Sequence, residues 1–189
     1  FRNFLDPYTW HWQNGNARWD ILNVARFCYA HKEEGSLNWV KNEKNRPIFK
    51  LDRLAPANNI EHANAHDALA DVRATIGIAK IIKKTQPKLF DYALSLNDKK
   101  EVGKLVKPLH PMLLTSSSFG YKSSFTRLVT AICNHPEYND RAIVFNLNQD
   151  PEIFLELETE ELKTLTFSRK SDLPKGGIEK IDLSELVYN

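Results

Sequence analysis

The sequence predicts a mixed α/β chain in which a helical first part is followed by a β-rich second part. Apolar residues recur at three- and four-residue spacing in residues 17–32 and 64–84, which is typical of helices that bury one face. Beyond Lys107 the pattern changes to short β-forming segments, MLLTSSSFGYKSS, RAIVFNLN and IFLELE, separated by Asn, Asp, Pro and Gly clusters. These segments predict a small β-barrel or sandwich.

The first helix is expected to run from about Ala17 to Lys32. Asn16 is a suitable residue to cap its start, and Gly35 is suited to ending it. Its apolar face should contain Trp19, Ile21, Leu22, Ala25, Phe27 and Cys28. The stretch GSLNWVKNEKNRP has Gly, Asn and Pro punctuation and little periodicity, so an exposed loop is predicted before IFKLDRLA re-enters the fold.

The second helix is expected to begin at a cap on Asn64 and to reach about Lys84. Pro87 should end it, and a shorter helix is predicted from Leu89 to about Lys104. The apolar face of the long helix is expected to contain Leu69, Val72, Ile76 and Ala79.

Composition excludes several classes of protein. With 189 residues, 42% of them hydrophobic and 11% aromatic, the chain can build a packed core. There is no apolar run of roughly 18 residues and no basic-then-apolar leader at Phe1, so we expect no membrane partner, no secretion signal and a cytoplasmic location. Cys28 and Cys133 lie in apolar surroundings without zinc-site spacing, and both are expected to be reduced and buried.

The net charge of +2 hides a difference between the two halves. Residues 1–86 hold 13 Lys and Arg against 9 Asp and Glu, a net +4, whereas residues 87–189 hold 13 against 15, a net −2. An anionic partner should therefore favour the first half. The run from Asp150 to Glu161 carries six carboxylates and no basic residue, so it should face away from such a partner.

The segment IEHANAHDALADVRAT is the best candidate for chemistry. It places His66 five residues before Asp71 at the start of a helix, with Asp67 one turn before Asp71. A carboxylate on a packed helix can hold a divalent metal, and a neighbouring imidazole can take a proton from an attacking water. The spacing alone also arises by chance, and Asp67 can simply stabilise the helix dipole while His66 is a surface residue.

The string NAHDALADVRATIGIAK resembles the third motif of the histidine branch of the carboxylate-cluster 3′–5′ exonucleases. RNFLDPYTWHWQNGNARWDILNVARFCYA, KTQPKLFDYALS, FGYKSSFTR and NHPEYNDRAIVFNL are similar to bacterial exonuclease I in particular, over essentially the whole chain. The resemblance implies hydrolysis of single-stranded DNA from the 3′ end to nucleoside 5′-monophosphates, in DNA repair. It assigns His66 as the general base and Asp71 as the last metal-binding carboxylate.

By the same resemblance, residues 1–86 are the C-terminal part of a ribonuclease-H-like exonuclease domain. Residues 87–189 are then a linker helix and part of a β-barrel of the Src-homology-3 type. The family uses four carboxylates to hold two Mg²⁺ ions, for which Mn²⁺ is expected to substitute. The other three carboxylates are expected before Phe1, so the chain is interpreted as an interior fragment that is inactive alone.

Aromatic and basic residues could bind the DNA strand. Tyr8 and Trp12 offer stacking surfaces for bases, and Arg26 and Lys50 are positioned like family residues that contact DNA. Because Lys50 stands where Arg is common, a point-charge contact is expected in place of a bidentate one. Further candidates are Tyr92, Lys99, Tyr121, Lys122 and Arg127, although buried tyrosines and ordinary surface lysines are an equally good interpretation.

The resemblance also implies partners. The parent protein is expected to be a monomer that binds single-stranded DNA and docks the acidic tail of the single-strand DNA-binding protein. The alternative function is a non-catalytic nucleic-acid-binding or protein-binding module that kept the fold without the chemistry. An Asp-x-Glu motif upstream of Phe1 would support the enzyme.

Overall fold

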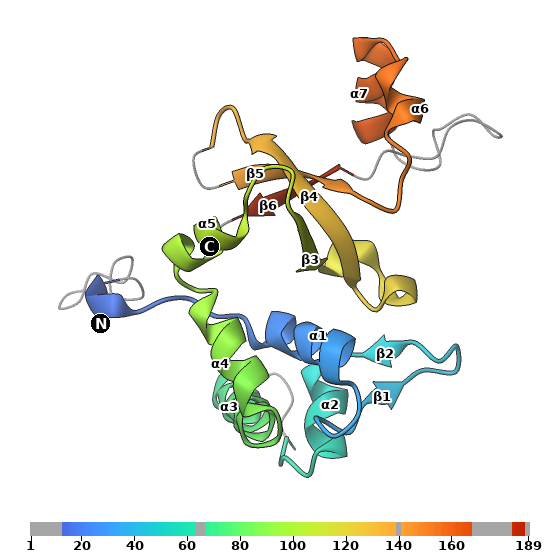
Figure 1. Cartoon of the computed structure of the whole chain (residues 1–189). Helices are drawn as coiled ribbons and strands as arrows, with labels where there is room; N and C mark the ends of the chain where they lie inside the picture. Colours follow the sequence, from blue (N-terminus) through green and yellow to red (C-terminus); the bar gives the residue numbers. More distant parts are fainter. Residues whose placement is uncertain (1–12, 63–66, 139–140, 168–182, 188–189) are drawn as a thin grey trace. The chain divides into compact units, whose positions relative to one another are not determined.

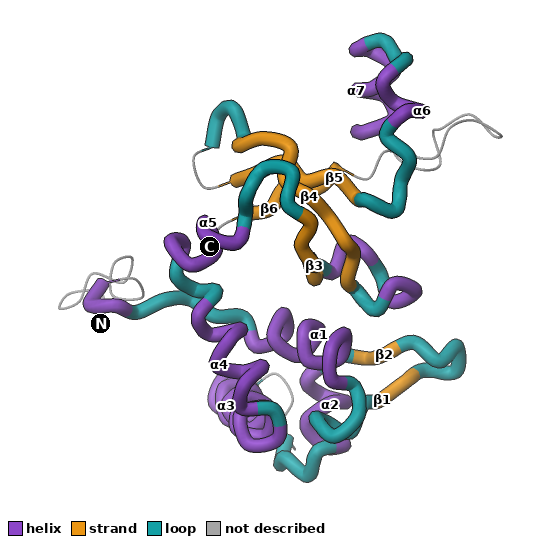
Figure 2. The backbone as a smooth tube through the Cα atoms, viewed as in Figure 1, coloured by secondary structure: helices purple, strands orange, loops and turns teal. Residues whose placement is uncertain are grey.

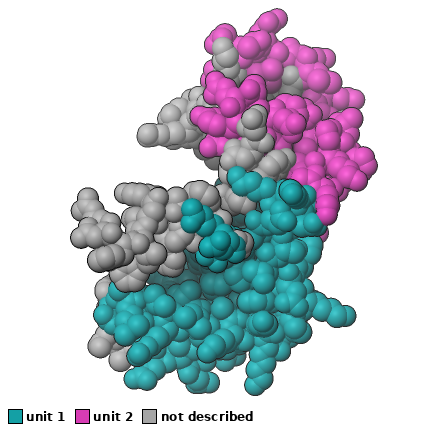
Figure 3. All heavy atoms as spheres, turned by 90° about the vertical axis from the view of Figure 1, so that its left-hand side faces the viewer, with its two compact units in different colours: residues 1–101, 115–126, 189 teal, residues 102–114, 127–188 magenta. Residues whose placement is uncertain are grey.

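The computed structural model describes residues 13–62, 67–138, 141–167 and 183–187. The chain divides into two compact units, which are coloured separately in Figure 3. Unit 1 comprises residues 1–101 and 115–126 with residue 189, and unit 2 comprises residues 102–114 and 127–188. The division into domains at residues 86 and 87 stays a prediction.

Helices predominate up to residue 105 and the four-stranded sheet follows, as Figures 1 and 2 show. In unit 1 the main elements are α1 (Ile21–Lys32), β1 (Val40–Lys41), β2 (Pro47–Ile48), α2 (Leu51–Ala57), α3 (Ala68–Thr85) and α4 (Pro87–Ser95). The later elements are α5 (Lys99–Leu105), β3 (Pro111–Thr115), β4 (Thr126–Asn134), β5 (Arg141–Asn146), α6 (Glu152–Leu155), α7 (Thr159–Phe167) and β6 (Leu183–Val187). Short 3-10 turns occupy Gln13–Gly15, Ser117–Phe119 and Tyr121–Ser123.

Helix α1 begins four residues later than predicted. Its cap is Asp20, whose side chain accepts a hydrogen bond from the Leu22 amide at 2.9 Å, so the expected cap at Asn16 is wrong. A carboxylate there also suits the positive end of the helix dipole. The helix ends at Lys32, and Gly35 follows with a φ of 71°, in agreement with the predicted stop.

The predicted exposed loop after α1 is a short antiparallel hairpin. Val40 pairs with Ile48 and Lys41 with Pro47, while Asn42 closes the turn by accepting hydrogen bonds from the amides of Lys44 and Arg46. Leu37, within the same stretch, is buried in the core. The predicted exposure is confirmed for residues 41–46, and the hairpin was missed because strands of two residues are too short to produce a period-two pattern.

Helix α3 is capped by Asp67 and not at the expected Asn64, a residue that lies outside the described part of the chain. Its buried side chains are Ala74, Ile78 and Ile82, which pack with α1, α2 and α4. Three residues of the predicted apolar face are exposed, Leu69 by 55%, Val72 by 54% and Ile76 by 48%, whereas Ala79 packs against the core. Periodicity indicates a helix, but two apolar stripes on one helix leave undecided which of them is buried.

The predicted helix from Leu89 to Lys104 is two helices, α4 and α5. Pro87 opens α4, where its missing amide hydrogen has no cost, and the chain turns after Ser95 before α5 begins at Lys99. Helix α4 packs on α3 through Phe90 and Ala93, which belong to the core of unit 1.

The sheet of unit 2 has the strand order β3-β4-β5-β6. Strand β4 pairs antiparallel with β5, and the register shifts between Ala131 and Cys133. Val129 and Ala131 are buried before this bulge, and Cys133 is exposed after it, so the expected burial of Cys133 is wrong. Burial of Cys28 is confirmed.

The segment IFLELE, predicted as a strand, begins with helix α6. Asp150 accepts a hydrogen bond from the Glu152 amide at 3.0 Å, and Pro151 follows it, a combination that favours the start of a helix. The β-branched and aromatic residues of IFLELE favour a strand, but this helix-start signal determines the structure of the segment's first residues. None of the helices in the described part of the chain combines the length and apolarity needed to cross a membrane.

Candidate active site

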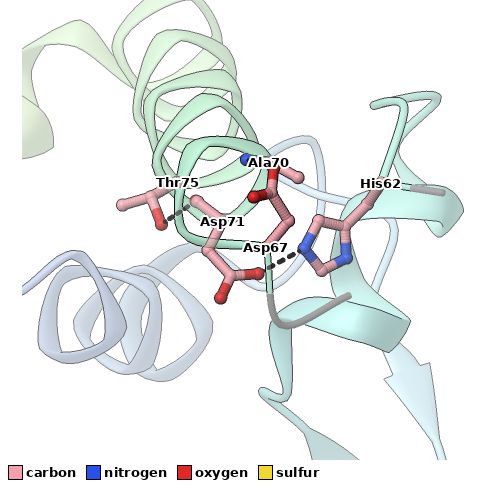
Figure 4. A network of polar contacts seen from close by, with 5 residues as sticks. All are labelled: His62, Asp67, Ala70, Asp71 and Thr75. Atoms are coloured by element: carbon pink, nitrogen blue, oxygen red, sulfur yellow. Dashed lines mark hydrogen bonds and ion pairs between the residues drawn. The ribbon is translucent and has the colours of Figure 1, made fainter. Parts of the chain in front are cut away.

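Asp71 lies on the first turn of α3, where the helix start is tightly organised (Figure 4). The Asp67 side chain accepts a hydrogen bond from the Ala70 amide at 3.2 Å, and its carbonyl accepts from the Asp71 amide at 2.9 Å. The Thr75 hydroxyl donates to the Asp71 carbonyl at 2.8 Å. These bonds fix the backbone of Asp71, and they leave the orientation of its carboxylate to other contacts.

That carboxylate is held by a residue which sequence reasoning missed. His62 Nε2 lies 2.7 Å from Asp71 Oδ1, and the imidazole points directly at the carboxylate (Figure 4). The His62 side chain is 2% exposed, whereas the Asp71 side chain is 43% exposed. The signal for His62 was the first histidine in EHANAH, four residues before His66.

Three of the predicted site residues lie outside the described residues. These are His66, which was assigned as the general base, and the stacking candidates Tyr8 and Trp12. Their roles stay predictions.

Asp71 fits the role of one metal ligand. Mg²⁺ prefers carboxylate oxygens, and the second carboxylate oxygen of Asp71 points away from the His62 ring (Figure 4). Within residues 13–62, 67–138, 141–167 and 183–187, there is no group of three or more His, Cys, Asp and Glu side chains that could hold a metal ion. The described residues therefore supply part of a metal site at most.

Of the predicted DNA-binding cations, Arg26 lies over the ring of Phe49, and Lys50 is the next residue after Phe49 in the chain. The Arg26 guanidinium lies 5.8 Å from the centroid of Phe49, and Lys50 is exposed. Arg26 also donates a hydrogen bond to Asn23 at 2.7 Å. Phe49 packs edge-to-face on Tyr29 and Phe125, so this ring belongs to an aromatic cluster and fixes where Arg26 can reach.

The other residues predicted to contact DNA differ in their exposure and in their neighbours. Tyr92 is 47% exposed, with its ring 6.1 Å from that of Phe27, and Lys99 is exposed at the start of α5. Tyr121 lies under the Arg46 guanidinium at 4.4 Å, an arrangement that sequence reasoning did not identify. Exposure is compatible with DNA contact at Tyr92 and Lys99, and the contact itself stays a prediction.

Comparison with known proteins matches both the sequence and the fold. A family model described as the exonuclease I SH3-like domain matches residues 97–189. Exodeoxyribonuclease I of Escherichia coli is 43% identical over 175 residues, which are 92% of this chain and 37% of that protein. The protein of the same name from Haemophilus influenzae is 40% identical over 191 residues, 100% of this chain and 40% of its own length. The whole chain is thus similar to a part of exonuclease I, and residues 97–189 match its SH3-like domain.

Solved exonuclease I structures show the same similarity. Exonuclease I of E. coli in complex with a dA16 oligonucleotide superposes with a TM-score of 0.91 at 40% identity, covering 100% of this chain and 40% of that one. A complex described as ExoI/SSB-Ct gives a TM-score of 0.87 at 38% identity, with the same coverage. A zinc-ion-bound form of the E. coli ExoI–ssDNA complex gives 0.88 at 40% identity, again with that coverage.

These matches confirm the resemblance that the motifs indicated and the expected α/β fold class. They also define its extent, because the chain spans about two fifths of the length of the exonuclease I relatives.

Proposed function

We propose that the full-length protein containing this chain hydrolyses single-stranded DNA from its 3′ end and releases nucleoside 5′-monophosphates. The observation that carries the proposal is the Asp71 carboxylate, which is partly exposed on the first turn of α3 and held by a buried imidazole. A carboxylate fixed in this way is suited to holding a divalent cation beside a phosphodiester. The exonuclease I relatives and the oligonucleotide in one of their structures support the substrate.

The proposed cofactor is Mg²⁺, two ions per complete site, with Mn²⁺ as a substitute. Asp71 would hold the metal together with three carboxylates from outside this chain. When bound, the two ions would stabilise charge on the attacking and leaving oxygens of the phosphodiester. A zinc-bound relative supports metal binding in the family. His66 would accept the proton of the attacking water, because an imidazole titrates near neutral pH.

The strand is proposed to follow the positively charged first half of the chain. Arg26 and Lys50 would neutralise phosphates, and Tyr8 and Trp12 would stack on bases. Tyr92 and Lys99 would contact the strand further along. Arg26 is supported by its packing over Phe49, which limits the conformational freedom lost on binding.

We further propose that the parent protein is a cytoplasmic monomer in DNA repair. Docking of the single-strand DNA-binding protein is supported by the ExoI/SSB-Ct complex, whose fold and sequence this chain matches.

Replacement of Asp71 by Asn tests the proposal in the full-length protein. The substitution removes the negative charge with almost no change of shape, and it should lower Mg²⁺-dependent nucleotide release by more than about 100-fold, since even outer partners of metal ligands cost 10–100-fold. Asp67→Asn is a matched control one turn earlier, because Asn also caps a helix. If Asp71→Asn keeps the rate and metal dependence of Asp67→Asn, the assignment is wrong.

The 189-residue chain alone is proposed to be inactive, because Asp71 would be the only one of the four carboxylates that it carries. Sustained digestion of single-stranded DNA by the purified chain, dependent on Asp71, would show that the remaining ligands come from elsewhere in this sequence.

A further inference from the structure

We infer that His62 is a positioning residue, which fixes the Asp71 carboxylate in the orientation needed for metal binding. The inference rests on the proposed function, since it requires Asp71 to be a metal ligand. It assigns a role to the pair His62 and Asp71 that neither the spacing of the motif nor the comparisons describe.

The contact has the geometry of a strong and specific hydrogen bond. The 2.7 Å distance between Nε2 and Oδ1 is at the short end of the range for a nitrogen donor and a carboxylate acceptor. A carboxylate can only accept, so Nε2 carries the hydrogen. The bond occupies one oxygen of Asp71 and restricts rotation of the whole carboxylate group.

The imidazole has little freedom to turn elsewhere. Its side chain is 2% exposed, and Nδ1 is buried with no hydrogen-bond partner among the described residues. A buried polar atom without a hydrogen-bond partner costs folding free energy. A histidine that lacked the bond to Asp71 as well would therefore be unfavourable at this position. The contact with Asp71 is the one described polar interaction that accounts for the placement of this ring.

The backbone before His62 is locked to the fold. The Asn58 side chain accepts from the Asn38 amide at 2.8 Å and donates to the carbonyls of Asn38 and Leu54 at 3.1 and 2.8 Å. Asn59 then adopts a φ of 58°, which turns the chain, and the Ile60 amide donates to the Ala55 carbonyl. The segment leading to His62 is thus tied to α2 and to the residues just before β1.

Ile60 adds a second anchor, this time on α3. Its side chain lies against Gly77, where a Cβ atom would come within 2.9 Å of Cδ1 and 3.1 Å of Cγ2. Gly77 lies six residues after Asp71 in the same helix, so the segment carrying His62 is fastened to the helix that carries the carboxylate. The distance between imidazole and carboxylate is therefore held by the fold.

Burial also argues against a different role for His62. A general base must reach the reacting water, directly or through one water molecule. An imidazole that is 2% exposed and already bonded to Asp71 cannot do so, and the proposed proton acceptor is His66. What His62 can do is hold Asp71, as residues behind metal ligands commonly do.

Two amide substitutions of His62 test the inference in the full-length protein. In His62→Gln the side-chain nitrogen is as many bonds from Cβ as Nε2 is, so it can still donate to Asp71. In His62→Asn the amide is one bond shorter and cannot reach. His62→Met fills the space with no donor, and Thr75→Val is the matched control, because Thr75 bonds the Asp71 carbonyl and not its carboxylate.

The readouts are the Mg²⁺ concentration at half-maximal nucleotide release, kcat at saturating Mg²⁺, and the melting temperature of the same preparation. His62→Asn and His62→Met should raise the half-maximal Mg²⁺ concentration by about 10–100-fold. His62→Gln should stay within a few-fold of wild type, and Thr75→Val should not change the Mg²⁺ dependence.

A purely structural role would lower the melting temperature in the His62 variants while leaving Mg²⁺ dependence at the wild-type value, and that result would overturn the inference. If His62→Met does not fold, the comparison of Gln with Asn decides. Asp71→Asn distinguishes a failure of the proposed function from a failure of the positioning role. Its full activity would reject the proposed function, whereas its inactivity together with unaltered His62→Asn would reject only the positioning role.

Discussion

Ile60 lies against Gly77 so closely that a Cβ atom at position 77 would approach three of its side-chain carbons at 2.9–3.2 Å. Real Cβ contacts are rarely this short, and all three carbons crowd the site, so Ile60 cannot relieve it by turning one methyl group. The glycine in α3 therefore has a packing reason. It lets the segment after α2 lie directly on the helix that carries Asp71.

Gly77→Ala should consequently destabilise the protein, although Ala is favoured over Gly inside a helix by about 1 kcal/mol. Overpacking against Ile60 should outweigh that gain, since it typically costs 1–3 kcal/mol. In an Ile60→Ala background the crowding carbons are gone, and Gly77→Ala should become stabilising. Urea unfolding of the four proteins measures the coupling, and an equal effect of Gly77→Ala in both backgrounds would contradict the packing argument.

The two cysteines should differ in reactivity. Cys28 is fully buried on α1, and burial raises the pKa of its thiol against the opposing hydrogen bond from Ser36. Cys133 is exposed on β4. A thiol reagent at pH 8 should label Cys133 in the native protein and Cys28 only after denaturation. Peptide mapping by mass spectrometry locates the label, with Cys133→Ser as the control. Equal labelling rates in the native state would refute the assignment.

The cysteine difference illustrates how far the sequence predicts this fold. The existence of α1 and α3 follows from apolar periodicity, and their ends at Lys32 and Thr85 lie near the expected positions. The exposure of Cys133 could not be predicted, because apolar neighbours in the sequence do not show that β4 leaves the packed part of the sheet at the bulge, after which Ile132, Cys133 and Asn134 are all exposed. The exposed stripe of α3 was mistaken for its buried one, because burial depends on which elements pack beside the helix.

The candidate site was predictable to a similar extent. Asp71 was found because a motif is contiguous in sequence, and its position on the first turn of α3 agrees with the expectation of a helix-borne carboxylate. His62 was missed because its relation to Asp71 depends on the path of the chain between α2 and α3. His62 and Asp71 are nine positions apart in the sequence, and neither helical nor strand spacing connects them.

His31 should make stability depend on pH. Burial lowers the pKa of its imidazole from 6.5, and the ring packs on Phe27 with Nε2 3.3 Å from the Thr115 hydroxyl. Below about pH 6.5 the unfolded chain binds the proton more readily, so this contribution to stability is complete above that pH and is lost as the pH falls through the lowered pKa.

His31→Gln removes the titration and can keep the bond to Thr115. The difference in unfolding free energy between wild type and variant should therefore change as the pH is lowered from 7.5 to 5, with wild type losing more stability. Urea titrations at several pH values provide the measurement. Parallel pH profiles of the two proteins would show that His31 titrates alike in the folded and unfolded states.

The contributions of charge and of base stacking to the affinity for single-stranded DNA should differ in their dependence on salt. Replacing Tyr8 and Trp12 with Leu should weaken binding by roughly 1–3 kcal/mol for each base that loses its platform, with nearly the same dependence on salt. Lys50→Ala should instead reduce the salt slope by about 0.7, the value for one phosphate contact on a single strand. Affinity measured across a salt series distinguishes the two effects. Unaltered affinity in the Leu variants would assign both aromatic residues to the core.

The role of His66 as general base can be separated from a structural role by measuring chemistry, binding and stability together. The motif resemblance assigns this role to His66, and His62 does not compete for it, since His62 is buried and bonded to Asp71. His66→Ala in the full-length protein should lower kcat by roughly 10²–10⁴. DNA affinity measured in Ca²⁺ should stay within a few-fold, because proton transfer contributes to the reaction and not to binding. If His66 is structural, His66→Ala should instead lower the melting temperature while the kcat of the folded protein is preserved. That combination would show that His66 is not the general base.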